Sequence, residues 1–243
     1  AYYDSVISNY FNKITNTNFP QKKIIHSNLI EKLRYGENPH QESAIYNENN
    51  NLRINKIHGK PLSYNNYNDI FSSLIISKTF PKNTGTVIVK HANPCGVSAI
   101  KNNLESFKSA LASDPISAFG GIVSCNFKIN KNIALEINKI FFEVIIANGF
   151  NNDALKILKK KKNLRLIDAS NFRFDQILKF NSYNNSILIQ TEDRNKFSKK
   201  DFKVVSKKKP TKSQLNNLIF AFNICRYVKS NAIVLASNNS TVG

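Results

Sequence analysis

Apolar residues recur at intervals of three and four along several stretches of this chain, a spacing that places them on one face of a helix. This spacing predicts helices over residues 2–14, 63–80, 103–112, 135–142, 152–162 and 213–230. Shorter runs of β-branched and aliphatic residues between turn formers predict strands. These strands are expected at residues 86–90, 121–126, 144–147, 164–167, 186–191 and 232–236.

The order of these segments predicts the fold class. Between residues 86 and 162 strands and helices alternate, which favours a mostly parallel sheet covered by helices on both faces, an α/β fold. Asn93-Pro94-Cys95-Gly96 is expected to break the strand structure after residue 92, because proline and glycine interrupt strands. The polar segment 15–27 and the lysine-rich segment 207–210 are expected to be connectors.

Length and composition limit the class of protein. With 243 residues, 41% of them hydrophobic, the chain can bury a substantial core. No apolar stretch approaches the roughly 20 residues that cross a bilayer, so a cytoplasmic location is expected. Cys95, Cys125 and Cys225 form no CxxC pair, which argues against a disulfide framework and a structural zinc site. Because the chain starts at Ala1 and contains no Met, we expect it to derive from a longer protein.

The net charge of +19 raises nucleic acid as a possible partner. The excess is mostly Lys, and Asn, Lys and Ile are frequent even in irregular stretches such as 47–51, which is typical of an AT-rich genome. A nucleic-acid site would instead concentrate Arg and aromatic residues on one stripe. A basic nucleic-acid-binding module is therefore kept only as an alternative, which a steep salt dependence without preference for nucleotide monophosphates would identify.

Lys90 and His91 are the first candidates for chemistry, since they end a buried strand just before a Pro/Gly turn. Sheets of α/β proteins place ligand-contacting groups at the carboxyl edge. A histidine can act as a general base near neutral pH, and an adjacent ammonium can stabilise an oxyanion. The alternative is a solvent-exposed lysine beside a histidine packed against the turn.

Two loop segments are further candidates. In LRYGENPHQ, residues 33–41, Arg34 could hold a phosphate or carboxylate with its bidentate guanidinium. In SDPISAFGGIV, residues 113–123, the glycines allow the backbone to approach a ligand and Phe119 could stack on it. Each segment could equally be an ordinary surface loop or tight turn.

A zinc-deaminase pattern, H-x-E followed by P-C-x-x-C, is only partly matched after His91. Position 93 is Asn rather than Glu and position 98 is Ser rather than Cys, so the metal ligands and the proton shuttle are missing. No metal site is expected.

Five segments occur in an order that is typical of one family. They are LRYGENPHQ (33–41), VIVKHANPCGVSA (87–99), SDPISAFGGIV (113–123), FFEVIIANGF (141–150) and RYVKSNAIVLASNNSTVG (226–243). From about residue 30 to residue 243 the chain resembles the bifunctional AICAR transformylase / IMP cyclohydrolase family.

The resemblance implies a domain organisation. The family's transformylase region is similar to two repeats of a three-layer, cytidine-deaminase-like α/β fold, of which this chain would hold the first repeat and the start of the second. Residues 1–16 would end the preceding cyclohydrolase domain, 17–29 would be a linker, 30–206 the first transformylase subdomain, and 207–243 the start of the second.

The resemblance also implies the reaction and the residues. A formyl group would pass from the cosubstrate 10-formyltetrahydrofolate to the 5-amino group of AICAR without a metal, in a homodimer. Lys90 and His91 match the catalytic pair. The residues that match ligand contacts are Arg34, Tyr35, Asn66, Phe119, Gly120, Glu143 and Asn231. A noncatalytic scaffold stays an alternative, against which Lys90, His91, Arg34 and Asn66 argue, and the chain alone could be inactive because the rest of the site lies outside it.

Overall fold

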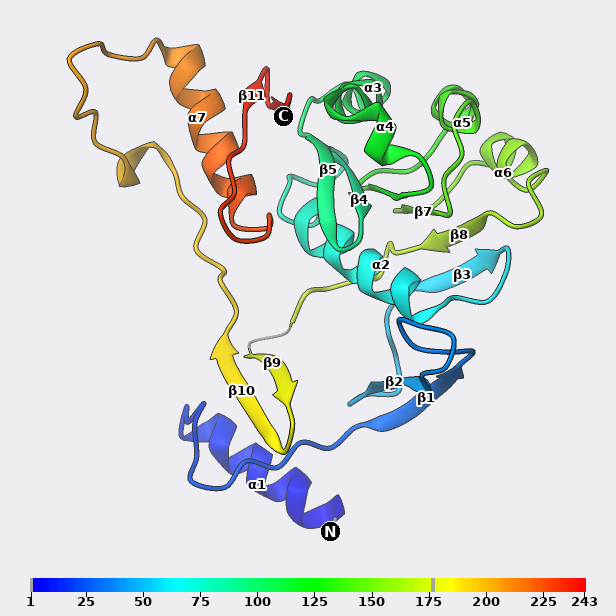
Figure 1. Ribbon diagram of the computed structural model, residues 1–243, viewed down its shortest axis with the longest axis vertical. Coiled ribbons are helices and arrows are strands. Elements are labelled where there is room, and N and C mark those ends of the chain that lie inside the picture. The colour runs from blue at the N-terminus through cyan, green and yellow to red at the C-terminus, as the bar shows by residue number, and fades with distance from the viewer. Residues whose placement is uncertain (1, 176–177) are drawn as a thin grey trace.

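The computed structural model describes residues 2–175 and 178–243. Ala1, Gln176 and Ile177, which fall within the expected segments 1–16 and 30–206, lie outside the described residues. The core of the fold is an eight-stranded sheet with the order β11-β12-β5-β4-β6-β7-β8-β3 (Figure 1). Its strands are β3 (Asn55–His58), β4 (Thr86–Lys90), β5 (Asn93–Ser98), β6 (Ile122–Cys125), β7 (Val144–Ala147), β8 (Arg165–Asp168), β11 (Ala236–Ser237) and β12 (Ser240–Thr241).

Helices cover both faces of this sheet, which confirms the predicted α/β class. On one face lie α3 (Asn103–Ser113), α4 (Pro115–Ala118), α5 (Lys131–Asn138) and α6 (Asn152–Leu158), and on the other lie α2 (Tyr64–Ser77) and α7 (Lys212–Cys225). Alternation along β4 explains the layers: Ile88 packs with the first group of helices, whereas Val87 and Val89 pack toward α2 and α7.

The sheet is mixed. Strands β6, β7 and β8 are parallel, as the alternation of strands and helices predicts. All other neighbours, including β4 with β6 and β3 with β8, are antiparallel. The finer likeness to a cytidine-deaminase-like repeat stays a prediction.

The prediction that residues 93–96 interrupt the strands was wrong. This segment opens β5, which pairs with β4 in a hairpin that puts Lys90 opposite Asn93. The register shifts between Ile88 and Val89, which accommodates an extra residue opposite β4 and bends the strand near Pro94. Proline is tolerated because this bulge disrupts the regular hydrogen bonding.

Other element boundaries differ from the expected ones. Helix α5 begins at Lys131, because the Asn130 side chain accepts a hydrogen bond from the Ile133 N–H and starts the helix earlier than its apolar pattern indicates. Helices α6 and α7 end at Leu158 and Cys225, before the expected limits. The strand expected at 232–236 is displaced to β11 and β12, which form a short hairpin with Asn238 and Asn239 in positive-φ conformations.

Several elements lie outside the central sheet. Helix α1 (Tyr2–Ile14) and the hairpin of β9 (Leu178–Tyr183) and β10 (Ser186–Thr191) lie at the end of the molecule away from the sheet (Figure 1). A second hairpin joins β1 (Asn28–Leu33) and β2 (Ser43–Asn47), and a short 3-10 helix covers Lys199–Asp201. Strands β1, β2, β3 and β9 were not predicted from the sequence.

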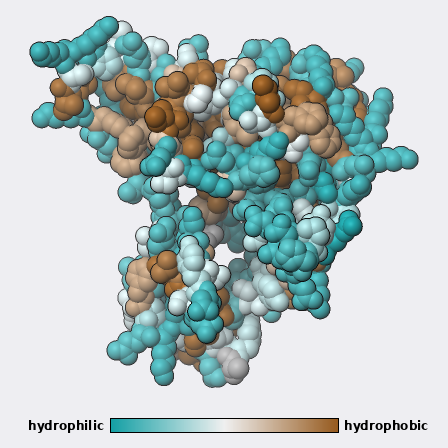
Figure 2. Space-filling view, in the orientation of Figure 1, coloured by the Kyte–Doolittle hydropathy of each residue, from teal (hydrophilic) through white to brown (hydrophobic). Residues whose placement is uncertain are grey.

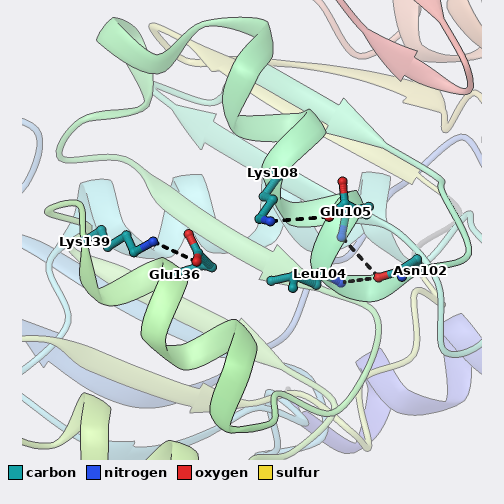
Figure 3. A network of polar contacts seen from close by, with 6 residues as sticks. All are labelled: Asn102, Leu104, Glu105, Lys108, Glu136 and Lys139. Carbon is teal, nitrogen blue, oxygen red and sulfur yellow. Dashed lines mark hydrogen bonds and ion pairs between the residues drawn. The ribbon is translucent and has the colours of Figure 1, made fainter.

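The surface carries both polar and apolar regions. On α3 and α5, Asn102 caps a helix, and Glu105–Lys108 and Glu136–Lys139 form exposed ion pairs (Figure 3). Apolar side chains are exposed over the region of α7 and the C-terminal hairpin (Figure 2). Within residues 2–175 and 178–243, no helix combines the length and apolar character that crossing a bilayer requires.

Candidate active site

The hairpin of β4 and β5 presents Lys90 and His91 on an unusual turn. His91 and Ala92 are the two central residues, and both have φ of 55°. Right-handed strand twist favours such left-handed turns, but the residues usually found there are Gly, Asn and Asp. An alanine in this conformation is strained, and local strain of this kind gathers at functional sites.

A cavity of about 480 Å³ opens beside this turn. It is lined by residues of α2, β4, β6 and β8, by the residue before β7 and by the β1–β2 loop. Its lining residues are Tyr35, Lys60, Ser63, Asn65, Asn66, Asp69, Lys90, His91, Gly120, Ile122, Phe141, Phe142, Glu143, Asn163 and Arg165. The cavity thus brings together six of the residues singled out in the sequence, namely Tyr35, Asn66, Lys90, His91, Gly120 and Glu143.

The edge of the sheet differs from the one expected. Lys90 does lie at the carboxyl end of its own strand. Because β4 runs antiparallel to β6, the cavity lies at the amino ends of the parallel strands, next to Ile122, Glu143 and Arg165. The rule that ligands bind at the carboxyl ends of parallel strands therefore indicated the correct residues, because Lys90 ends β4. For β6, β7 and β8 the same rule indicated the wrong edge of the sheet.

Lys90 is fixed by a neighbouring loop. Its Nζ donates a hydrogen bond to the Phe119 carbonyl oxygen at 2.9 Å. The lysine is half-buried and His91 is exposed. A neutral carbonyl acceptor leaves the ammonium charge available to an anionic group in the cavity.

Asn66 and Glu143 form another part of the cavity lining. Asn66 is at the third position of α2, where its Oδ1 accepts the Ser63 N–H in a capping box. Its Nδ2 donates to Glu143 Oε2 at 3.0 Å, and Arg165 Nη1 lies 3.6 Å from the same oxygen. Arg165 is also held by the Pro61 carbonyl, at 3.0 Å from its Nε. These contacts fix the direction of the Glu143 carboxylate.

Asp69 lies one turn after Asn66 on α2 and contacts the strained turn. Its Oδ1 accepts the Ala92 N–H at 2.6 Å. Burial raises the pKa of Asp69, while the backbone N–H groups of Ala92 and His91 oppose this shift. Asp69 therefore links the first half of α2 to the loop that carries His91.

Three predicted residues are absent from the cavity lining. Arg34 is exposed, with its guanidinium carbon 5.5 Å from the Tyr35 ring centre. The Phe119 side chain is 59% exposed and its ring centre lies 5.4 Å from that of Phe141. Asn231 is exposed in the loop after α7, which approaches the site where the Lys229 N–H donates to Asn93 Oδ1 at 3.2 Å.

Sequence reasoning missed other lining residues. Asp69 shares the face of α2 with Asn66, and that i, i+3 spacing could have indicated it. Lys60, Asn163 and Arg165 come from loops and a strand start that carry no local signal, since the pairing of β8 with β7 and of β3 with β8 brings them near.

The arrangement combines cations, carboxylates and an imidazole. Lys60, Lys90 and Arg165 can attract an anionic ligand, whereas Asp69 and Glu143 can accept hydrogen bonds from hydroxyl or amino groups. His91 can exchange a proton with a group bound in the cavity. The chemistry that this cavity offers is proton transfer on a polar, anionic ligand.

The chain matches one protein family over its whole length. Residues 1–243 match the family described as AICARFT/IMPCHase bienzyme. The chain is similar to proteins named bifunctional purine biosynthesis protein PurH. The one from Leptospira biflexa is 44% identical over 247 residues and the one from Caldicellulosiruptor saccharolyticus 41% over 252 residues. These alignments include 100% of this chain but 48% and 49% of the relatives, so the chain spans about half their length.

Proposed function

Because the chain belongs to the AICARFT/IMPCHase bienzyme family, we propose that it supplies part of the active site of an AICAR transformylase. In this reaction the formyl group of 10-formyltetrahydrofolate passes to the 5-amino group of AICAR, a step of purine biosynthesis. The complete gene product would also carry IMP cyclohydrolase activity. The observation that carries the proposal is the gathering of Lys90, His91, Asn66 and Glu143 around one cavity.

The nucleophile sets the chemical requirement. The amine of AICAR is attached to an aromatic ring and is a weak nucleophile, so its proton must leave as its nitrogen attacks the formyl carbon. Attack converts the formyl C=O into a tetrahedral oxyanion. Breaking the bond from that carbon to the folate nitrogen restores the C=O, and the leaving nitrogen takes up a proton.

Lys90 and His91 supply these two needs in the proposal. His91 accepts the amine proton, since an exposed imidazole at the rim of the cavity can reach a bound amine. Lys90, held by the Phe119 carbonyl, places a positive charge near the developing oxyanion or donates a proton to the departing folate nitrogen.

The remaining residues would bind the nucleotide. Glu143, oriented by Asn66 and Arg165, would accept hydrogen bonds from ribose hydroxyls. Arg34 would contact the phosphate, beside Tyr35. Phe119 and Gly120 would lie near the base, and Asn231 near the carboxamide. We also propose a cytoplasmic homodimer whose further segments complete the site, with no metal in the reaction.

The test is formyl transfer by the complete gene product with AICAR and 10-formyltetrahydrofolate, followed as tetrahydrofolate release. His91→Ala should lower kcat at least about a hundredfold, the usual worth of a general base. The matched control is His26→Ala, because His26 contacts Tyr2 and Asn9 and does not line the cavity.

Each outcome has a separate meaning. An active wild type with a crippled His91→Ala variant and an unaffected His26→Ala variant supports the proposal. An active wild type with an unaffected His91→Ala variant contradicts the role of His91. An inert wild type overturns the transformylase proposal and favours a noncatalytic scaffold.

A further inference from the structure

We infer that Asp69 is a positioning residue that holds the His91-Ala92 turn in its left-handed conformation, and so aims His91 at the bound amine. This inference rests on the proposed function in so far as it concerns catalysis. It assigns Asp69 a role through the backbone of the turn, without contact between its carboxylate and the reacting atoms.

The conformation of the His91-Ala92 turn is energetically unfavourable. His91 and Ala92 both have positive φ, and the Cβ of a residue other than glycine crowds the following carbonyl in this region. The hairpin register explains part of the conformation, since Lys90 pairs with Asn93 and leaves two residues to reverse the chain. A two-residue loop without glycine therefore needs an additional contact to keep it in one conformation.

A hydrogen bond between Asp69 and the backbone of Ala92 provides this contact. The Ala92 N–H points at Asp69 Oδ1, at 2.6 Å, which is short for an N–H···O hydrogen bond and typical of a charged acceptor. In the part of the chain that the structure describes, no lysine or arginine forms an ion pair with Asp69. The backbone N–H of Ala92 is thus a hydrogen-bond donor to the Asp69 carboxylate.

Asp69 lies on α2, a helix that is packed against the sheet. Asp69 precedes Ile70, which is fully buried against the sheet, and follows Asn66, which is fixed to Glu143. A side chain on such a helix moves little relative to β6 and β7. Asp69 consequently ties the position of the His91 loop to the same helix that orients the ribose-binding wall.

The decisive variants separate the hydrogen bond from the charge. Asp69→Ala removes the acceptor, and a misplaced His91 should lower kcat about a hundredfold with little change in the KM for AICAR. Asp69→Asn keeps an oxygen acceptor and should retain most of the activity. Asn68→Ala, an exposed neighbour on α2 outside the cavity lining, is the matched control and should behave as wild type.

A rescue variant tests the turn directly. Adding Ala92→Gly to Asp69→Ala removes the Cβ that opposes positive φ, and should restore kcat by about tenfold. Ala99→Gly in the same background should restore nothing, because Ala99 is not among the residues with positive φ. A merely structural role for Asp69 in α2 would give no rescue at position 92.

Amide hydrogen exchange provides a readout that does not depend on activity. In the complete protein, the Ala92 N–H should exchange slowly in wild type and in Asp69→Asn, and much faster in Asp69→Ala. If wild type proves inert, the transformylase proposal fails while this measurement still tests the turn. The inference is overturned if Ala92 exchanges alike in wild type and Asp69→Ala, or if Asp69→Asn loses as much kcat as Asp69→Ala, which would make the carboxylate itself a participant.

Discussion

Asn66 Nδ2 and Glu143 Oε2 lie 3.0 Å apart in the lining of the cavity, although 77 positions separate the two residues in the sequence. The same asparagine caps α2 through its Oδ1, so one side chain fixes both the start of a helix and the direction of a carboxylate. Because amide nitrogen donates and amide oxygen accepts, an asparagine can do both at once, whereas an aspartate can only accept.

Asn66→Asp should therefore weaken nucleotide binding while leaving the helix start intact. The variant keeps an acceptor for the Ser63 N–H but places a second carboxylate beside Glu143. Losing a hydrogen bond to a charged group costs about 2 kcal/mol, so the Kd for AICAR should rise at least about tenfold, as measured by titration calorimetry. Asn68→Asp adds the same charge to the exposed side of α2 and should leave the Kd unchanged. Equal Kd values for both variants would contradict a binding role for Glu143.

Gly96 on β5 should not tolerate a side chain. A Cβ at this position would lie 1.8 Å from the Ala110 carbonyl oxygen on α3, which is backbone and cannot turn aside. Gly96→Ala should lower the free energy of unfolding by about 3 kcal/mol, measured by urea denaturation. Gly243→Ala, whose Cβ would meet Leu235 Cδ1 at 3.7 Å, is the control. Wild-type stability of Gly96→Ala would mean that α3 is free to move away from β5.

The Gly96 contact also shows where sequence patterns fail. Asn93-Pro94-Cys95-Gly96 contains residues that break strands, yet it forms one, because its partner β4 and the helix above it impose the conformation. Local pattern identified β4, β6 and β7, whose buried runs pack on both faces of the sheet. Tertiary contacts decided β5, and no spacing within 93–98 records them.

The same distinction holds for the candidate site. Lys90 and His91 were recognisable as the end of a buried strand, and Asn66 and Glu143 by resemblance to a family. Arg165 was not, since its closeness to Glu143 follows from the parallel pairing of β7 with β8. The chain direction of β6 relative to β4, which decides the edge on which the cavity lies, also cannot be derived from the order of elements.

Lys78 gives a pH dependence of stability. Burial, with the nearby Arg173, lowers the pKa of this lysine from 10.5 to about 8, and its Nζ donates to Asn148 Oδ1 and the Ala169 carbonyl. The unfolded chain therefore binds more protons than the folded chain between pH 8 and 10.5. In that window the Lys78 contribution to stability should increase as the pH rises.

The magnitude follows from the same shift. The full change in pKa corresponds to about 3 kcal/mol, and the partial exposure of the ammonium reduces it to about 1 kcal/mol. Urea denaturation of wild type and Lys78→Met at pH 7.5 and pH 10 should show wild type gaining this amount relative to the variant. A constant difference between the two proteins across this range would show that Lys78 keeps its ordinary pKa.

Phe119 separates a backbone role from a side-chain role within one residue. Its carbonyl oxygen holds Lys90, while its exposed ring leans on Phe141 at the rim of the cavity. Phe119→Ala keeps the carbonyl and removes the ring. If the ring stacks on the bound base, an aromatic contact of about 1 kcal/mol is lost, so the KM for AICAR should rise about fivefold while kcat is retained. Ile116→Ala removes another exposed apolar side chain, 86% exposed, from the short helix α4 that precedes Phe119, and should change neither constant. A fall in kcat without a change in KM would mean instead that the ring keeps the carbonyl oriented toward Lys90.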